Sequence, residues 1–150
     1  MKEIVSRVED IEPHLKYIFS VLISRTNCHD LDGIEGVPEV MQPSQGQKPK
    51  LMTRLIEPNE VARRLLLDLS FTLVEVIEED EMRLYVNEMV NIVRVFLMDP
   101  FGEIQEEACR LCSEFCSKFK DLLYHFTVIL SRAILLPLVS KKSSIKIASL

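Results

Sequence analysis

The chain has 150 residues, the length of one domain or of one segment of a repeat array, and enough to bury a hydrophobic core without disulfides. Its 18 basic and 23 acidic side chains give a formal net charge of −5 without an obvious basic stripe, which disfavours binding to nucleic acid or to anionic membranes. The 47% hydrophobic content excludes general disorder, and four glycines are too few for a glycine-rich phosphate loop.

Apolar residues recur at helical spacing through most of the chain, and sustained strict alternation is absent, so the sequence predicts an all-α fold. Two short helices are expected over residues 2–10 and about 13–25. The inner stripe of the second is expected to contain Ile18, Val21 and Leu22. Residues 27–57 hold three glycines and three prolines, and we expect a long disordered loop there, with partner binding as the alternative.

A helix is predicted over residues 58–78, with apolar residues on most of its faces. Its main stripe is expected to contain Val61, Ala62, Leu65, Leu66, Leu69, Leu73, Val76 and Ile77. Leu67, Phe71 and Val74 add apolar surface on another side, so more than one neighbour is expected to cover this helix. The acidic residues 78–81 are interpreted as a solvated helix boundary rather than as a metal site.

Three further helices follow in the sequence. One over residues 82–98 should stop at Asp99 and Pro100, because the residue before a proline disfavours helical dihedrals. The clearest amphipathic helix covers residues 102–119. Its apolar half contains Ile104, Ala108, Leu111, Cys112, Phe115 and Phe119. A last long helix is predicted from an Asp121 N-cap to about residue 136, ended by Pro137, and helical periodicity explains its apolar residues without a membrane.

One more helix is expected to begin at Ile145, capped by Ser143 and Ser144. The helices that contain Val61, Ile104 and Ile145 open alike, with a turn, a β-branched residue and a nearby small or basic residue. The β-branched residues Val61, Ile104 and Ile145 are 43 and 41 residues apart. This period lies within the range of about 40–47 residues for HEAT and armadillo repeats. The chain is therefore predicted to be a single α-solenoid segment, residues 1–150, of about three helical hairpins, with the last one truncated.

Asp99, Pro100, Ile104 and Ala108 match the turn of a HEAT repeat, and the sequence resembles the HEAT-repeat family. The resemblance implies a right-handed α-solenoid of HEAT-type hairpins. Gln105 stands where the family usually has arginine. This departure weakens the expectation of an aspartate–arginine ladder between repeats.

The order and spacing of several runs resemble the family of HEAT-repeat axonemal dynein assembly factors over about residues 58–150. These runs are residues 85–94, 97–100, 104–110 and 135–138. The resemblance implies a cytoplasmic, non-enzymatic scaffold for preassembly of axonemal dynein arms, with dynein heavy or intermediate chains and cochaperones as partners, and tubulin as a further candidate. The alternative is another HEAT scaffold, of the tubulin-binding, transport or phosphatase-scaffold type, with the same periodicity.

The resemblance to HEAT arrays, in particular to tubulin-binding ones, implies that partners bind at the turns inside the repeats, here residues 99–103 and 140–144. The candidate contact residues are Asp99, Phe101, Glu103, Lys141 and Lys142. An exposed Phe101 would be an anchor, and the two lysines would suit an acidic partner. In the alternative interpretation, Phe101 packs within its own turn and stabilises it, and the two lysines only keep their turn in contact with solvent.

Three of the four cysteines, Cys109, Cys112 and Cys116, lie within one predicted helix. With His125 they could be imagined as zinc ligands, but structural zinc cysteines usually lie in knuckles and turns. We interpret them as small hydrophobic residues and free thiols of a reducing compartment, which agrees with a cytoplasmic location and with the absence of a signal-peptide pattern. No metal, cofactor or catalytic group is predicted.

Overall fold

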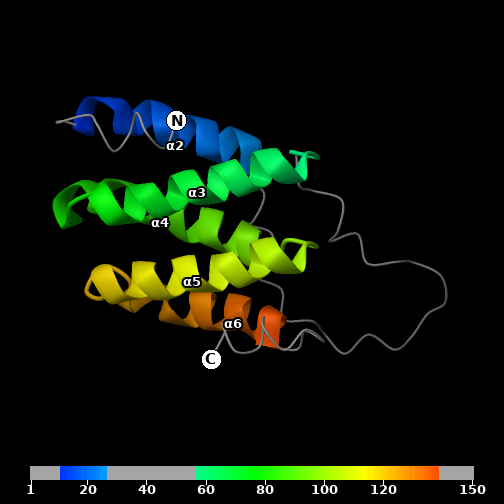
Figure 1. The fold of residues 1–150 in the computed structure, drawn as a ribbon. Helices are drawn as coiled ribbons and strands as arrows, with labels where there is room; N and C mark the ends of the chain where they lie inside the picture. Colours follow the sequence, from blue (N-terminus) through cyan, green and yellow to red (C-terminus); the bar gives the residue numbers. More distant parts are fainter. Residues whose placement is uncertain (1–10, 27–56, 139–150) are drawn as a thin grey trace, which may run out of the picture.

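The computed structural model describes residues 11–26 and 57–138. These ranges contain α-helices and no strand, so the predicted all-α fold is confirmed (Figure 1). The helices are α2 (Glu12–Thr26), α3 (Glu60–Val76), α4 (Glu79–Leu97), α5 (Gly102–Lys118) and α6 (Thr127–Leu138), with a short 3₁₀ helix, η3 (Tyr124–Phe126), before α6. The helix expected over residues 2–10 and the one expected from Ile145 lie outside the described residues, as does the expected loop apart from Glu57.

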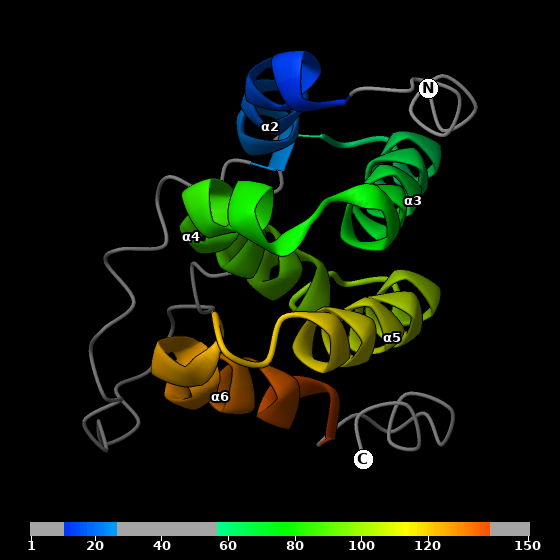
Figure 2. The ribbon, with the colours of Figure 1, turned by 90° about the vertical axis from the view of Figure 1, so that its left-hand side faces the viewer.

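The described helices form two layers. One layer contains α2, α4 and α6, where α4 packs against both of the others, and the second contains α3 packed against α5 (Figure 2). The two layers join where α5 packs on α4 and α6. This arrangement is a stack of helical hairpins, in which each new hairpin extends both layers. The predicted α-solenoid is therefore confirmed, while its right-handed sense stays a prediction.

The starts of α3 and α4 follow from local capping chemistry. Asn59 caps α3, because its Oδ1 accepts hydrogen bonds from the backbone N–H groups of Val61 at 2.9 Å and Ala62 at 3.4 Å. At the start of α4 the Glu78 N–H donates to Glu81 Oε2 at 3.1 Å, and acidic side chains fill the positive first turn. The interpretation of residues 78–81 as a helix boundary is therefore confirmed.

Aromatic and branched side chains between the helices make one continuous core. All six residues of the predicted apolar half of the 102–119 helix are buried. Phe19 of α2 stacks on Tyr85 of α4, with ring centroids 4.4 Å apart. Phe115 meets Phe119 edge to face at 5.6 Å. These contacts fix how α2 lies on α4 and how α5 ends.

The predicted inner stripe of α2 is partly wrong. Leu22 is buried and Ile18 is half-buried, but Val21 is 43% exposed. The buried positions are Leu15, Phe19, Leu22 and Thr26. These residues are spaced as one helical stripe, so the helix is rotated relative to the prediction.

The last helix begins later than predicted, at Thr127 rather than after Asp121. Residues 121–126 form turns and the 3₁₀ helix, and the Thr127 hydroxyl donates to the carbonyls of Leu123 at 3.3 Å and Tyr124 at 2.9 Å. The helix also runs to Leu138, past the expected stop at Pro137. Within the two described ranges, no helix combines the length and hydrophobicity needed to cross a bilayer.

Candidate protein-binding surface

Asp99 organises the turn between α4 and α5. Its Oδ1 accepts a hydrogen bond from the Phe101 N–H at 2.9 Å, and its Oδ2 lies 2.8 Å from Arg63 Nε of α3. Its side chain is 0% exposed. Asp99 was expected to contact a partner, but this burial excludes direct contact, because both carboxylate oxygens face the protein itself. Asp99 instead positions the turn that carries Phe101 and Glu103.

Arg63 joins this turn to the start of the preceding hairpin. Besides the ion pair with Asp99, its Nη1 donates to the backbone carbonyls of Glu57 at 3.2 Å and Pro58 at 3.1 Å. The Arg63 side chain is only 4% exposed, and its Nη2 has no hydrogen-bond partner. Arg63 is thus a buried cation that binds both the turn before α5 and the segment before α3. It makes the link between repeats that was expected of an arginine at position 105. Gln105 Nε2 donates instead to the Leu97 carbonyl at 2.9 Å.

Phe101 lies on the surface, as expected, with 44% of the residue exposed. One side of its ring faces Arg63, whose guanidinium carbon is 5.0 Å from the ring centroid. Its carbonyl accepts the Gln105 N–H at 3.0 Å and so begins α5. Phe101 therefore packs within the turn against Arg63 and also offers apolar surface to solvent, while its role as an anchor for a partner stays a prediction.

Glu103 is also on the surface, with its side chain 72% exposed. It forms an ion pair with Arg64 of α3, which also pairs with Glu60 at 3.1 Å. The hydrogen bond to Glu103, followed by that to Glu60, raises the pKa of Arg64. The Arg64–Glu103 pair connects the starts of α3 and α5, and the Arg64–Glu60 pair lies within α3; both contribute little to stability, because water screens them.

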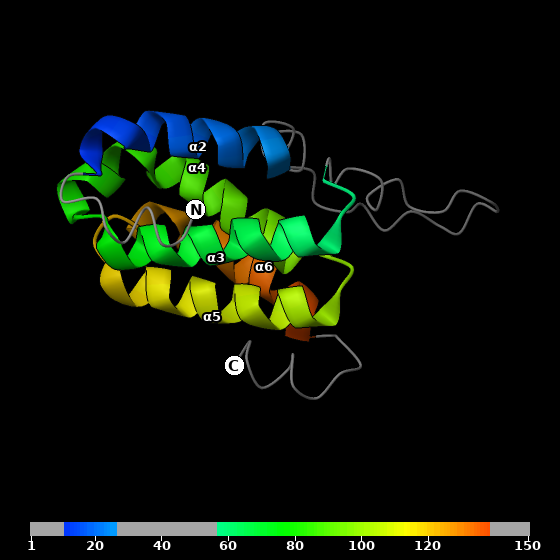
Figure 3. The same cartoon turned by 45° about the horizontal axis from the view of Figure 1, so that its top comes forward.

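Val61 and Leu65 were expected to face inward, but they are 65% and 63% exposed. They share a face of α3 with Arg64, which reaches toward α5. The starts of α3 and α5 lie side by side (Figure 3). We name this surface the rim and define it as Val61, Arg64, Leu65, Phe101 and Glu103. It combines exposed apolar side chains at the start of α3 and in the turn before α5 with the Arg64–Glu103 ion pair.

The sequence prediction missed three of the rim residues, Val61, Arg64 and Leu65. Val61 and Leu65 could have been found from the number of apolar residues on α3, which is larger than one buried stripe can hold. Lys141 and Lys142, the other predicted contact residues, lie outside the described residues.

The cysteines of α5 lie within one helix, as the sequence indicated. Burial raises the pKa of Cys109 to about 11. A hydrogen bond from the Cys112 thiol to the Cys116 sulfur raises the pKa of Cys112, the donor, and lowers the pKa of Cys116, the acceptor, to about 7. In the part of the chain that the structure describes, no three His, Cys, Asp or Glu side chains are grouped closely enough to hold a metal ion. His125 lies against Tyr124, with ring centroids 5.5 Å apart.

Comparison with protein families gave a match over residues 47–150 to the family described as "Dynein axonemal assembly factor 5-like, TPR repeats". Comparisons with curated proteins and with solved structures gave no match. Although the description names TPR repeats, α3 and α5 begin 42 residues apart, at Glu60 and Gly102. A TPR repeat has about 34 residues, so the spacing is of the HEAT type.

The matched region includes α3, α4, α5 and α6, and thus both layers of the array and the whole rim. It covers more than half of the chain. The chain therefore belongs to the family of dynein axonemal assembly factor 5-like repeat proteins.

Proposed function

We propose that this chain is a non-enzymatic scaffold segment that binds proteins during cytoplasmic preassembly of axonemal dynein arms. The observation that carries the proposal is the family match over residues 47–150. The two-layered helical array supports it, because such arrays offer extended surfaces to protein partners. The proposed partners are dynein heavy or intermediate chains and their cochaperones.

The rim is the proposed contact surface within the described residues. Phe101 is the proposed anchor, since aromatic side chains in partly exposed positions often dominate interface energy. Val61 and Leu65 would extend the apolar contact along α3, and Glu103 with Arg64 would supply polar contacts at its edge. Lys141 and Lys142 are proposed to add attraction for an acidic surface.

A capture experiment with two matched variants tests the proposal. The chain is immobilised, incubated with an extract of ciliated cells, and its ligands are quantified by mass spectrometry. Phe101→Ala removes the proposed anchor without touching the core, and we expect it to reduce recovery of dynein chains and cochaperones about tenfold or more, as for an interface hot spot. Leu84→Ala is the control, because Leu84 is 75% exposed on α4, away from the rim.

Each outcome of this capture has a defined meaning. Equal recovery by Phe101→Ala and by the control, with unchanged circular dichroism, would remove Phe101 from the binding surface. Recovery of tubulin, transport factors or phosphatase subunits without any dynein chain or cochaperone would contradict the assembly role and favour another kind of HEAT scaffold.

A further inference from the structure

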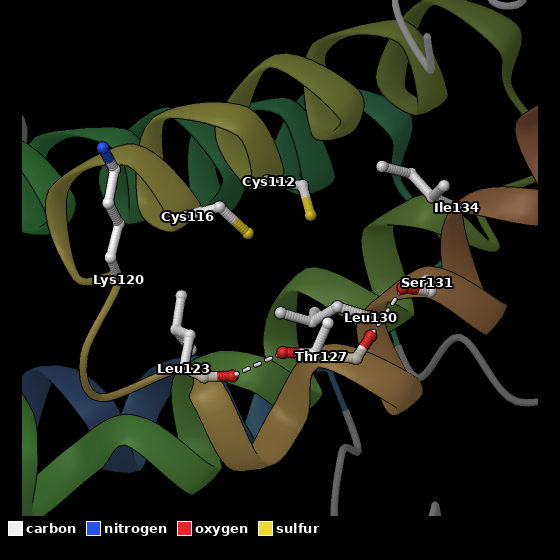
Figure 4. Close-up of a pocket in the computed structure, with 8 residues that line it drawn as sticks. All are labelled: Cys112, Cys116, Lys120, Leu123, Thr127, Leu130, Ser131 and Ile134. Atoms are coloured by element: carbon white, nitrogen blue, oxygen red, sulfur yellow. Dashed lines mark hydrogen bonds between the residues drawn. The ribbon is translucent and has the colours of Figure 1, made fainter.

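A cavity of about 310 Å³ lies between α5, the turn after it and α6, and none of its lining residues belongs to the rim (Figure 4). Cys112 and Cys116 of α5 line one side of it. Leu123, Leu130 and Ile134 line the other side. Its volume is at the lower end of the range of about 300–1,000 Å³ for small-molecule sites, so it can hold a small apolar group.

Cys112 and Cys116 both line the cavity, but they differ in exposure and in pKa. They are four residues apart on one helix, and both sulfur atoms turn toward the cavity in Figure 4. Cys112 is buried, whereas Cys116 is partly exposed. The Cys112 thiol donates a hydrogen bond to the Cys116 sulfur, which stabilises the Cys116 thiolate and lowers its pKa to about 7. The thiolate is the nucleophilic form of cysteine, and Cys116 is the partly exposed one of the three thiols of α5, so it is the one that a reagent can reach.

The remaining surroundings favour an uncharged ligand. The hydroxyls of Thr127 and Ser131, which also line the cavity, already donate to backbone carbonyls, Thr127 to that of Leu123 and Ser131 to that of Thr127. Lys120 is the one charged side chain of the lining, and Figure 4 shows its amine directed away from the two sulfurs. The lining is therefore mainly apolar, and its one cation is directed away from the two sulfurs.

We propose that Cys116 is a covalent modification site for a soft, uncharged electrophile with an apolar tail, of the α,β-unsaturated carbonyl class. The Cys116 sulfur forms a bond to the β-carbon with its own electron pair. The π pair of the carbon–carbon double bond moves toward the carbonyl to give an enolate, and the α-carbon then takes a proton from water. No group leaves and no oxidant is needed. The tail occupies the cavity beside Leu123, Leu130 and Ile134.

The test uses the whole chain carrying Cys28→Ser, so that the thiol outside the described residues does not react. The chain is treated at neutral pH with N-benzylmaleimide or N-(2-carboxyethyl)maleimide, which share a reactive group and differ in their tails. Peptide mapping gives the rate at each cysteine, normalised to a free cysteine peptide. We expect Cys116 to react about tenfold faster than Cys109 or Cys112, and the benzyl reagent to be favoured at Cys116 about fivefold.

Two variants separate the thiol effect from the cavity effect. Cys112→Ala removes the hydrogen-bond donor, so the rate of Cys116 should reach its half-maximum at higher pH than the value of about 7 for the parent. Lys120 and Cys112 are the titratable groups beside Cys116 in the cavity lining, and α6 contributes none to that lining. Ile134→Ser should reduce the preference for the benzyl tail while leaving the carboxyethyl rate unchanged.

The proposal is independent of the assembly role, because labelling is measured without any protein partner. Equal rates at all three thiols of α5 would overturn it. Equal normalised rates for the two reagents at Cys116 would also overturn it, since the cavity would then contribute nothing to ligand choice.

Discussion

At the scale of residues, the Arg63–Asp99 pair is a buried polar link between repeats. It lies in the interior, with side chains 4% and 0% exposed, and it spans 36 positions of the chain. The sequence showed Asp99 clearly, but it did not show the partner. The expected arginine directly follows the β-branched residue, where Gln105 stands, whereas Arg63 comes two residues after Val61. The ion pair could be located only once α3 and α5 were known to lie side by side.

Asp99→Ala should be strongly destabilising. The change leaves the Arg63 guanidinium buried without a counter-charge, and it also removes the acceptor of the Phe101 N–H. Breaking a buried pair from one side typically costs about 3–5 kcal/mol, and we expect a loss of this size in the free energy of unfolding measured with urea.

A double variant and a surface control show whether the lost stability comes from the buried ion pair. In Arg63→Met with Asp99→Ala no buried charge remains, so part of the lost stability should return. Glu107→Ala removes an exposed ion pair with Arg110 and should change the free energy of unfolding by less than about 1 kcal/mol. If Asp99→Ala were no more harmful than this control, the pair would not hold the repeats together.

At the scale of elements, α3 is held to α5 at both ends. Arg63 acts at its start, and Lys118 acts at its end, where its Nζ donates to the carbonyls of Val74 at 2.9 Å, Glu75 at 2.8 Å and Ile77 at 2.8 Å. These carbonyls are at the negative end of the helix dipole, where a cation is favourable. This role was not predicted, because it depends on the end of α3 lying beside the end of α5, which the pattern of a single helix does not show.

Lys118→Met should loosen the last turn of α3. The three carbonyls lose a charged donor, and we expect faster amide hydrogen exchange over residues 74–77 with a loss of about 1 kcal/mol in global stability, since Lys118 is partly solvated. Lys120→Met is the matched control, because Lys120 is two residues away in sequence and does not make these contacts. Equal exchange in the two variants would show that Lys118 does not cap α3.

A helix was predicted well where the pattern of its own residues determines its bounds and its buried face. All six residues predicted for the apolar half of α5 are buried, because its polar and apolar residues separate cleanly around the helix. Cys109 was left out of that half and is buried as well. The stripe of α2 was misjudged at Val21, because several apolar residues give the helix more than one possible inner face. The start of α6 was misplaced, because side-chain hydrogen bonds of Thr127 and a 3₁₀ turn replace the expected Asp121 cap.

At the scale of the whole molecule, the repeat period was the most informative property of the sequence. Spacings of 43 and 41 residues predicted a helical solenoid. The structure has two helical layers, one of α2, α4 and α6 and the other of α3 and α5. The surface was harder to predict, because the exposure of Val61 and Leu65 depends on which helices lie beside α3. Asp99 was predicted as a contact and is buried for the same reason: its partner Arg63 comes from the preceding hairpin.

Site-specific photo-cross-linking tests the central claim, that the rim binds components of dynein assembly, most directly. A photoreactive phenylalanine analogue is placed at position 65 in the rim or, as a control, at position 84 of α4. Both positions are exposed, Leu65 at 63% and Leu84 at 75%, so folding should be preserved in both. The account predicts that, in an extract of ciliated cells, position 65 gives adducts with dynein chains or cochaperones and position 84 does not. Adducts with these proteins from position 84 alone would contradict it.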